Sequence, residues 1–302
     1  MPGPEETSVS ERLPPGIRVG GSALADGVMM LTPLAVAIAR EGPNGILAVE
    51  AFPLPERRPH PIEKLLFVRI LPKLVSQLAL VVKGWRPTKG RKISLPILAT
   101  VLAIGLVSSG LNVFFAGLPT YWHAVLSSLL QLVLFFSLIA MTRAVPQFGR
   151  IWRFHGGEHQ AIAAYEAEMD LTVENAATRT LYHPRCGTNL ATLSIVFMVP
   201  GMVIGSLVSG FAGYVITVAV PLIALCVAFE IVMLGQTKWR AVLWPGLAFQ
   251  RLTVARPGRA EAAAGIAALQ AALREHVQVE AARAAAAALV PVRVRAASHA
   301  AE

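Results

Sequence analysis

Residues 190–234, LATLSIVFMVPGMVIGSLVSGFAGYVITVAVPLIALCVAFEIVML, contain a single charged side chain, Glu230. A helix needs about 20 predominantly apolar residues to cross the hydrocarbon core of a bilayer. The stretch is therefore long enough for two crossings, which we expect over Leu190–Gly210 and Tyr214–Leu234. Helices in the core of a soluble protein normally keep a polar face, and these two segments have none, so the stretch predicts a transmembrane hairpin.

Two earlier segments, Ile93–Phe115 and His123–Met141, have the same apolar character. With the later pair they predict a mainly α-helical integral membrane protein with about four transmembrane helices in two hairpins. The chain of 302 residues is 55% hydrophobic and only 15% charged, against roughly a quarter charged in an ordinary soluble domain. The lipid bilayer is therefore the first expected partner.

Lysine and arginine are distributed unevenly around these spans. They cluster before the first span, after the second and after the fourth, at Lys83, Arg86, Lys89, Arg91, Lys92, Arg143, Arg150, Arg153, Lys238 and Arg240. The short connections over residues 116–122 and 211–214 contain neither residue type. Because basic loops stay in the cytoplasm, we expect both termini and the long middle loop to be cytoplasmic. Aromatic residues interleaved with a basic patch, which nucleic-acid binding requires, are missing, so we expect no nucleic-acid partner.

The composition divides the chain into seven segments. They are a disordered leader (1–18), a small β unit (19–61), an interfacial amphipathic helix (62–92), a first transmembrane hairpin (93–145), a cytoplasmic loop (146–189), a second transmembrane hairpin (190–235) and a cytoplasmic interfacial segment with an Ala-rich helix and tail (236–302). In the β unit, residues 34–40 and 46–52 are strand-like runs separated by a turn, and Gly20 with Gly21 predicts a tight bend. Basic residues interrupt residues 62–85, which suits a helix on the cytoplasmic membrane surface, with a re-entrant segment as the alternative.

The segment from Arg259 to Leu289 is rich in alanine and is expected to be helical. Ile266, Leu269, Leu273 and Val277 form a narrow apolar stripe along it. Such a stripe packs weakly, either on the rest of this chain or on a protein partner. A membrane-associated partner for this helix is therefore one of our expectations.

The middle loop contains FHGGEHQ, Phe154–Gln160, with two histidines and a glutamate. On a helix, His155 and His159 are one turn apart and face the same way, so they can share one metal ion. Glu158 between them completes H-x-x-E-H, the inverted zincin pattern of two histidine ligands and a glutamate that activates bound water. This pattern predicts a divalent metal, zinc by its donor types.

The stretch HPRCGT at the end of the same loop adds His183 and Cys186, at a spacing that lets one turn hold two ligands. With four protein ligands the site is closed and structural, whereas three leave a position for water and allow catalysis. Two alternatives remain. Cys186 can be a nucleophile with His183 as its base, or the loop can be polar and its histidines cap helices or contact lipid headgroups.

Four other residues bear on this choice. Gly156 and Gly157 cost up to about 1 kcal/mol each in a helix relative to alanine, which makes sense where something approaches the backbone closely. Arg185 can hold an anionic substrate group or face lipid phosphate. Glu230 is an ionisable residue within a span, which is functional by default unless it lies near enough to the cytoplasmic end to reach water.

Six motifs of the chain occur in the same order in the YqhQ-like bacterial membrane family (DUF1385), which the chain resembles from about Val19 to the Ala-rich helix. They are VGGSALADGVMM (19–30), FHGGEHQAIAAYEA (154–167), LTVENA (171–176), HPRCGTN (183–189), FEIVML (229–234) and WPGLAFQRLT (244–253). The family is described as predicted metal-dependent enzymes without an assigned reaction. The resemblance implies a bacterial inner-membrane location and a functional set comprising His155, Gly156, Glu158, His159, Glu166, Glu174, Asn175, His183, Arg185, Cys186 and Gly187. The chain departs from the family pattern at Asp26, Leu31 and Gln160.

These observations lead to two hypotheses. The first is a membrane hydrolase that uses a metal-bound water at the cytoplasmic face, with His155, His159 and either His183 or Cys186 as ligands and Glu158 as base. A site beside the membrane favours a lipid, a lipid-linked molecule or a membrane peptide as substrate. The second is a non-catalytic membrane scaffold or assembly factor whose metal is structural. In either case Glu166, Glu174, Asn175, Arg185 and Glu230 are candidates for contacts to substrate or to the ligands.

Overall fold

The computed structural model describes residues 13–42, 45–56, 61–76 and 117–288, together with residues 110, 113 and 115. In this part of the chain the protein is mostly helical, with one small N-terminal sheet. Three helices are long and apolar enough to cross a membrane, α3 (Thr120–Thr142), α6 (Gly187–Leu207) and α7 (Gly210–Thr237). They coincide with three of the predicted spans, and the expected span Ile93–Phe115 lies outside the described residues apart from the isolated positions at its end.

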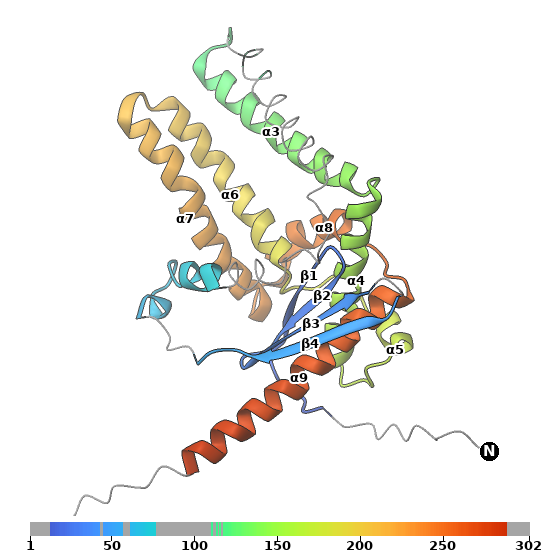
Figure 1. The fold of residues 1–302 in the computed structure, drawn as a ribbon. Coiled ribbons are helices and arrows are strands. Elements are labelled where there is room, and N and C mark those ends of the chain that lie inside the picture. Colours follow the sequence, from blue (N-terminus) through green and yellow to red (C-terminus); the bar gives the residue numbers. More distant parts are fainter. Residues whose placement is uncertain are drawn as a thin grey trace, which may run out of the picture.

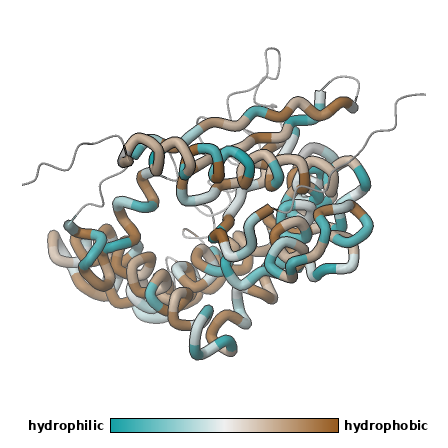
Figure 2. The backbone as a smooth tube through the Cα atoms, turned by 90° about the horizontal axis from the view of Figure 1, so that it is seen from below, coloured by the Kyte–Doolittle hydropathy of each residue, from teal (hydrophilic) through white to brown (hydrophobic). Residues whose placement is uncertain are grey.

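The spanning helices bury few side chains within the chain, between 6% and 22% of their most apolar windows. Their remaining apolar surface needs a hydrophobic environment, which a bilayer supplies. Figure 2 shows hydrophobic residues concentrated in the spanning helices and mixed with hydrophilic ones elsewhere. Helices α6 and α7 pack as a hairpin, and α3 packs on α6. At Gly201 and Gly205 the absence of a side chain lets α6 approach α7 closely.

The N-terminal unit is a four-stranded antiparallel sheet in the order β1-β2-β3-β4. Its strands are β1 (Gly20–Ala23), β2 (Gly27–Leu31), β3 (Ala35–Glu41) and β4 (Leu47–Pro53). Both predicted strand runs are confirmed as β3 and β4. The predicted bend at Gly20 and Gly21 is wrong, because both residues lie in β1 and pair with Leu31 and Met30.

One face of the sheet packs against α4 (Pro146–Glu166) and α9 (Arg259–Ala288). Val28 and Met30 of β2 and Leu269 and Leu273 of α9 belong to this core and are fully buried. Figure 1 shows α9 lying along the sheet, on the side away from the spanning helices. The first half of α9 is thus covered by its own chain, while most residues beyond Val277 are exposed.

Three shorter elements lie between the long helices. They are α5 (Val173–Ala177), the 3-10 helix η2 (Arg240–Leu243) and α8 (Trp244–Thr253). Thr172 caps α5 by accepting a hydrogen bond from the Asn175 amide, and the helix is only five residues long. The leader expected over residues 1–18 is packed from residue 13 onward, because the Tyr165 hydroxyl donates to the Pro14 carbonyl at 2.6 Å.

A segment before the spans, residues 61–76, is only partly helical. It begins with the 3-10 helix η1 (Pro61–Lys64), and residues 70–76 are α-helical. The remainder of the interfacial helix predicted over 62–92 lies outside the described residues.

Candidate metal centre

Helix α4 brings His155 and His159 together as the sequence predicts, with ring centroids 4.4 Å apart. Cys186 is the residue that caps the N-terminus of α6, and its Sγ lies 3.3 Å from Nε2 of His155. One possible ligand atom from each of these three residues lies within 4.8 Å of the others. Two ligands of a tetrahedral zinc ion are roughly 3.6 Å apart for one nitrogen and one sulfur, so the donor types and their spacing fit this metal.

Two backbone carbonyls fix which nitrogen each histidine presents to the others. Nδ1 of His155 lies 2.8 Å from the Thr253 carbonyl, and Nδ1 of His159 lies 2.5 Å from the Leu181 carbonyl. A carbonyl oxygen can only accept, so both Nδ1 atoms carry the proton and both Nε2 atoms keep a lone pair. A protein that holds histidine ligands usually orients them in this way.

Two polar atoms in the centre have no hydrogen-bond partner among the described residues. They are Nε2 of His159 and Oε2 of Glu158, and both are buried. An unpaired buried polar atom is costly, and a group bound in the cavity would supply the partner that each of these atoms lacks. Burial, and secondarily His155, lower the pKa of His159 to about 3, so its imidazole is neutral and available as a ligand.

Glu158 occupies a pocket that depends on a glycine in the sheet. A side chain at Gly21 would place its first carbon 2.8 Å from the Glu158 carboxyl group. Burial is the main reason why the pKa of Glu158 is raised to about 8. The nearby His155 lowers this pKa, and Cys186 raises it further. A cation bound beside this carboxyl would lower that pKa toward neutrality, the range in which a general base is most effective.

The turn that carries Cys186 is fixed by two buried amide side chains. Gln250 of α8 accepts from the His183 amide at 2.9 Å and donates to the His183 carbonyl at 2.9 Å. Asn189 donates to the carbonyls of His183 and Pro184. Both amides are fully buried. The position of the thiol is thus set from two helices, α6 and α8.

His183 lies beside this centre but uses both ring nitrogens elsewhere. Its Nδ1 accepts from the Arg185 amide at 3.2 Å, and its Nε2 is 3.1 Å from Glu166. Glu166 also pairs with the Arg185 side chain. Burial lowers the pKa of His183 to about 4, so the contact to Glu166 is a hydrogen bond of a neutral imidazole near neutral pH.

The other residues expected around the site are spread over the molecule. Glu174 pairs with Arg259 at 3.3 Å on the surface, and Asn175 donates to the Asp170 carbonyl within its own loop. Glu230 contacts the segment over residues 61–76. None of these three is among the residues that line the cavity beside the His–His–Cys group.

That cavity has a volume of about 320 Å³ and lies between β1, α4 and the start of α6. Its polar lining includes the predicted site residues His155, Glu158, His159, His183, Arg185 and Cys186 together with Ser22 and Thr188, and Trp152 contributes to its wall. The Trp152 indole donates to Thr142 Oγ1, at the end of α3, at 3.1 Å. Because α3 ends and α6 begins beside the cavity, the cavity lies at the ends of two candidate spans.

Sequence reasoning missed several residues that shape the centre. Gly21 makes room for Glu158, Thr253 and Leu181 orient the histidines, and Gln250 holds the turn. The available signals were weak. Gly20 with Gly21 indicates a bend, and Gln250 lies between Phe249 and Arg251 in a segment whose pattern suits the membrane surface.

The fold and the site define a class, namely a membrane protein with several spans and a candidate His–His–Cys metal centre at the ends of two of them. The chain belongs to the family described as "Protein of unknown function (DUF1385)", which matches residues 76–275. It is 29% identical over 140 residues to "Uncharacterized protein YqhQ" of Bacillus subtilis (strain 168). That alignment covers 44% of this chain and 43% of the relative, less than half the length of either. No solved structure matches the chain.

Proposed function

We propose that this protein is a metal-dependent hydrolase at the cytoplasmic face of the bacterial inner membrane, and that His155, His159 and Cys186 hold a zinc ion. The observation that carries the proposal is that backbone carbonyls accept from Nδ1 of both histidines, so that both Nε2 atoms keep a lone pair. Nε2 of His159 is buried without a partner among the described residues. When bound, the ion supplies Lewis acidity. Three protein ligands leave a coordination position open, as in catalytic zinc sites.

The residues of this chain supply the remaining chemistry. Glu158, which lies between the two histidines in the sequence, is buried and lines the cavity. It is placed to take the proton from an attacking water and to return it to the leaving group. The cavity at the ends of α3 and α6 favours a substrate that resides in the membrane or is tethered to it.

Metal analysis of the purified full chain tests the ligand set. We expect about one zinc ion per chain in the wild type and in His123→Ala, a histidine outside the centre. The double variant His155→Ala/His159→Ala and the variant Cys186→Ser should lose it. Chelation should lower the melting temperature of the wild type, because a ligand that binds only the folded state stabilises it, and should leave the double variant unchanged. Full metal retention in the double variant contradicts the proposal.

Glu158→Gln separates catalysis from a structural metal. The variant preserves shape and should keep zinc, but it removes the base. Under the hydrolase proposal it fails to complement a deletion strain in cells. Under the alternative of a scaffold or assembly factor with a structural metal, the same variant supports growth like the wild type.

The short distance between Cys186 and His155 favours one second candidate, a cysteine nucleophile with His155 as its base. A nucleophilic cysteine needs a lowered pKa, whereas burial raises the pKa of the Cys186 thiol despite hydrogen bonds from Thr188. A metal overcomes this by replacing the proton. Rapid alkylation of Cys186 in zinc-loaded protein would favour the nucleophile, and protection from alkylation by zinc favours the ligand.

A further inference from the structure

Glu230, which the candidate metal centre does not use, is the one acidic residue in the described spanning helices α3, α6 and α7. Its carboxylate accepts two hydrogen bonds from the Arg69 guanidinium, at 2.8 and 2.6 Å, and one from the Phe67 amide at 3.1 Å. Arg69 and Lys73 also lie over the ring of Phe229, at 5.7 and 5.6 Å. The segment 61–76 is thereby held on α7 at one point.

The backbone at this point is itself constrained. Phe67 has a φ of 65°, in the left-handed region that a bulky residue rarely adopts. Such a conformation persists only where the surroundings hold it, and the hydrogen bond from the Phe67 amide to Glu230 is a contact that does so. The local fold of the segment therefore depends on the Glu230 carboxylate.

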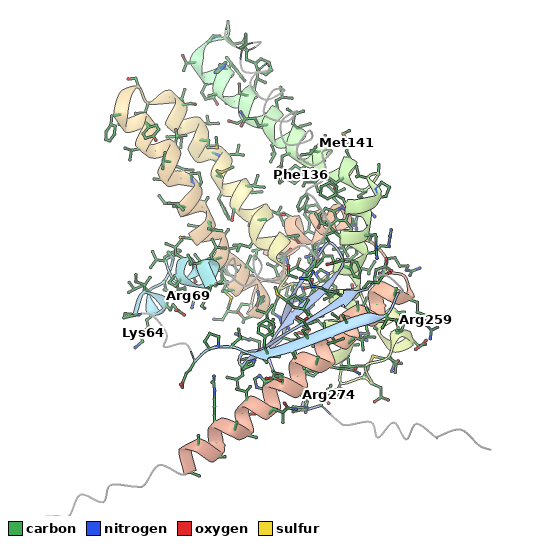
Figure 3. All side chains as sticks on the ribbon, viewed as in Figure 1. Lys64, Arg69, Phe136, Met141, Arg259 and Arg274 are labelled. Carbon is green, nitrogen blue, oxygen red and sulfur yellow. The ribbon has the colours of Figure 1, made fainter. Side chains whose placement is uncertain are left out.

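The held segment presents large apolar side chains outward. Leu65, Leu66 and Phe67 are 58%, 63% and 52% exposed, and Val75 is 70% exposed. Basic residues Lys64 and Lys73 lie among them. Figure 3 shows Lys64 and Arg69 on this segment beside the lower part of α7. Apolar side chains mixed with lysines are typical of segments that lie in the interface of a membrane with anionic lipids.

The depth of Glu230 along α7 agrees with that environment. Helix α7 begins at Gly210, and the distance from there to Glu230 along the axis is about 30 Å at 1.5 Å per residue. This equals the thickness of the hydrocarbon core. If Gly210 lies at one surface of the core, Glu230 lies at the other, where an ion pair with an interfacial arginine is tolerated.

We propose that residues 61–76 are an interfacial anchor that inserts Leu65, Leu66 and Phe67 into the bilayer boundary, and that Glu230 positions this anchor through Arg69 and the Phe67 amide. The occupant of the exposed apolar surface is thus the acyl-chain and headgroup boundary of an anionic membrane. The proposal uses no residue of the metal centre and holds whether or not the chain binds zinc.

Photo-crosslinking of the full chain in nanodiscs of phosphatidylethanolamine and phosphatidylglycerol tests the anchor. A benzophenone amino acid at the position of Leu66 should form a lipid adduct, detected by mass spectrometry. The same amino acid at the position of Val49, an exposed apolar residue of β4, is the matched control and should form none. Absence of a lipid adduct at the Leu66 position, or equal yields at both positions, overturns the proposal.

The role of Glu230 is tested in the same assay. Glu230→Gln should reduce the lipid adduct at the Leu66 position several-fold while the zinc content stays that of the wild type. Glu230→Asp keeps a carboxylate that can accept from both Arg69 and the Phe67 amide and should retain most of the yield, which separates positioning from a general folding defect. An unchanged yield in Glu230→Gln, or a loss in Glu230→Asp as large as in Glu230→Gln, contradicts the positioning role.

Discussion

At the scale of single residues, the missing side chain at Gly21 makes room for the Glu158 carboxyl group. Gly21→Ala should therefore destabilise the protein by about 1–3 kcal/mol, the usual cost of an extra methyl group in a packed region. Gly20→Ala is the matched control, because a side chain there meets no atom within 4 Å. Thermal unfolding in detergent measures both. Equal melting temperatures for the two variants would show that Glu158 does not need this space.

The buried Glu158 carboxyl makes the metal-free protein sensitive to pH. Burial raises its pKa from the ordinary 4.5 to about 8, so between these values the folded state keeps a proton that the unfolded state releases. Stability of the metal-free protein should then fall as the pH rises from about 4.5 to about 8. Glu158→Gln removes this dependence and should raise the melting temperature at pH 8 more than at pH 5. If the melting temperatures of Glu158→Gln and the wild type differ by the same amount at pH 5 and at pH 8, Glu158 does not have a raised pKa in the folded protein.

Much of the centre could be predicted from local spacing, because one helical turn separates His155 from His159 and one tight turn carries Cys186. Whether His183 has a ring nitrogen free to bind a metal could not be predicted in this way. Which ring nitrogen is free depends on partners distant in sequence, here Glu166 for His183 and the Thr253 carbonyl for His155. The space for Glu158 depends on strand β1, which no local pattern connects to α4.

At the scale of elements, α4 is crossed closely by the connection from α8 to α9 and by the first turn of α9. A side chain at Gly156 would lie 2.0 Å from the Ala255 carbonyl, and one at Gly157 would lie 2.5 Å from the Glu261 carbonyl. The glycines noted in the sequence thus do mark a close approach, and what approaches is the protein's own backbone. The same crossing places the Thr253 carbonyl on His155.

Gly156→Ala should push this crossing chain away and disturb the orientation of His155. We expect a lower melting temperature and weaker zinc binding, seen as zinc loss at a lower chelator concentration. Gly149→Ala, in the same helix, is the control, since its side chain meets the nearest atom at an ordinary 3.5 Å and alanine favours the helix by about 1 kcal/mol. Wild-type zinc retention in Gly156→Ala would refute the coupling between crossing and ligand.

The helices and strands could be predicted from the hydrophobic pattern where that pattern extends over many residues. Three spans and two strands lie within a few residues of their predicted limits. Helix α9 was predicted as a helix, yet its apolar stripe does not say what covers it. Its small residues, among them Ala264, Ala268 and Ala272, let it lie close to the sheet and α4, so the first half of the helix packs on its own chain, one of the two alternatives that the pattern leaves open.

At the scale of the whole molecule, polar and aromatic residues mark two ends of the spanning helices. Exposed Tyr121, Trp122, Phe211 and Tyr214 lie at one end, near the start of α3 and the α6–α7 connection, which are both at the upper end of the view in Figure 1. Exposed Trp239 and Trp244 lie at the opposite end, with the basic residues Lys238 and Arg240. Aromatic residues favour both membrane boundaries and basic residues favour the cytoplasmic one.

This arrangement predicts the orientation of the chain in the cell. The α6–α7 connection should face the outside, and the sheet, α4 and α9 should face the cytoplasm. Ser209→Cys should react with a membrane-impermeant maleimide in intact spheroplasts. Glu280→Cys, on the exposed half of α9, should react only after the membrane is permeabilised.

The wild-type chain is the control for this labelling, because its two native cysteines are Cys186 at the candidate centre and Cys226 within α7. Labelling of Glu280→Cys in intact spheroplasts, with Ser209→Cys protected, would place the candidate metal centre outside the cell. The hydrolase would then act on substrates of the outer leaflet rather than the cytoplasmic one. The orientation thus decides which side of the membrane supplies the substrate, because the cavity lies at the end of α6 opposite the α6–α7 connection.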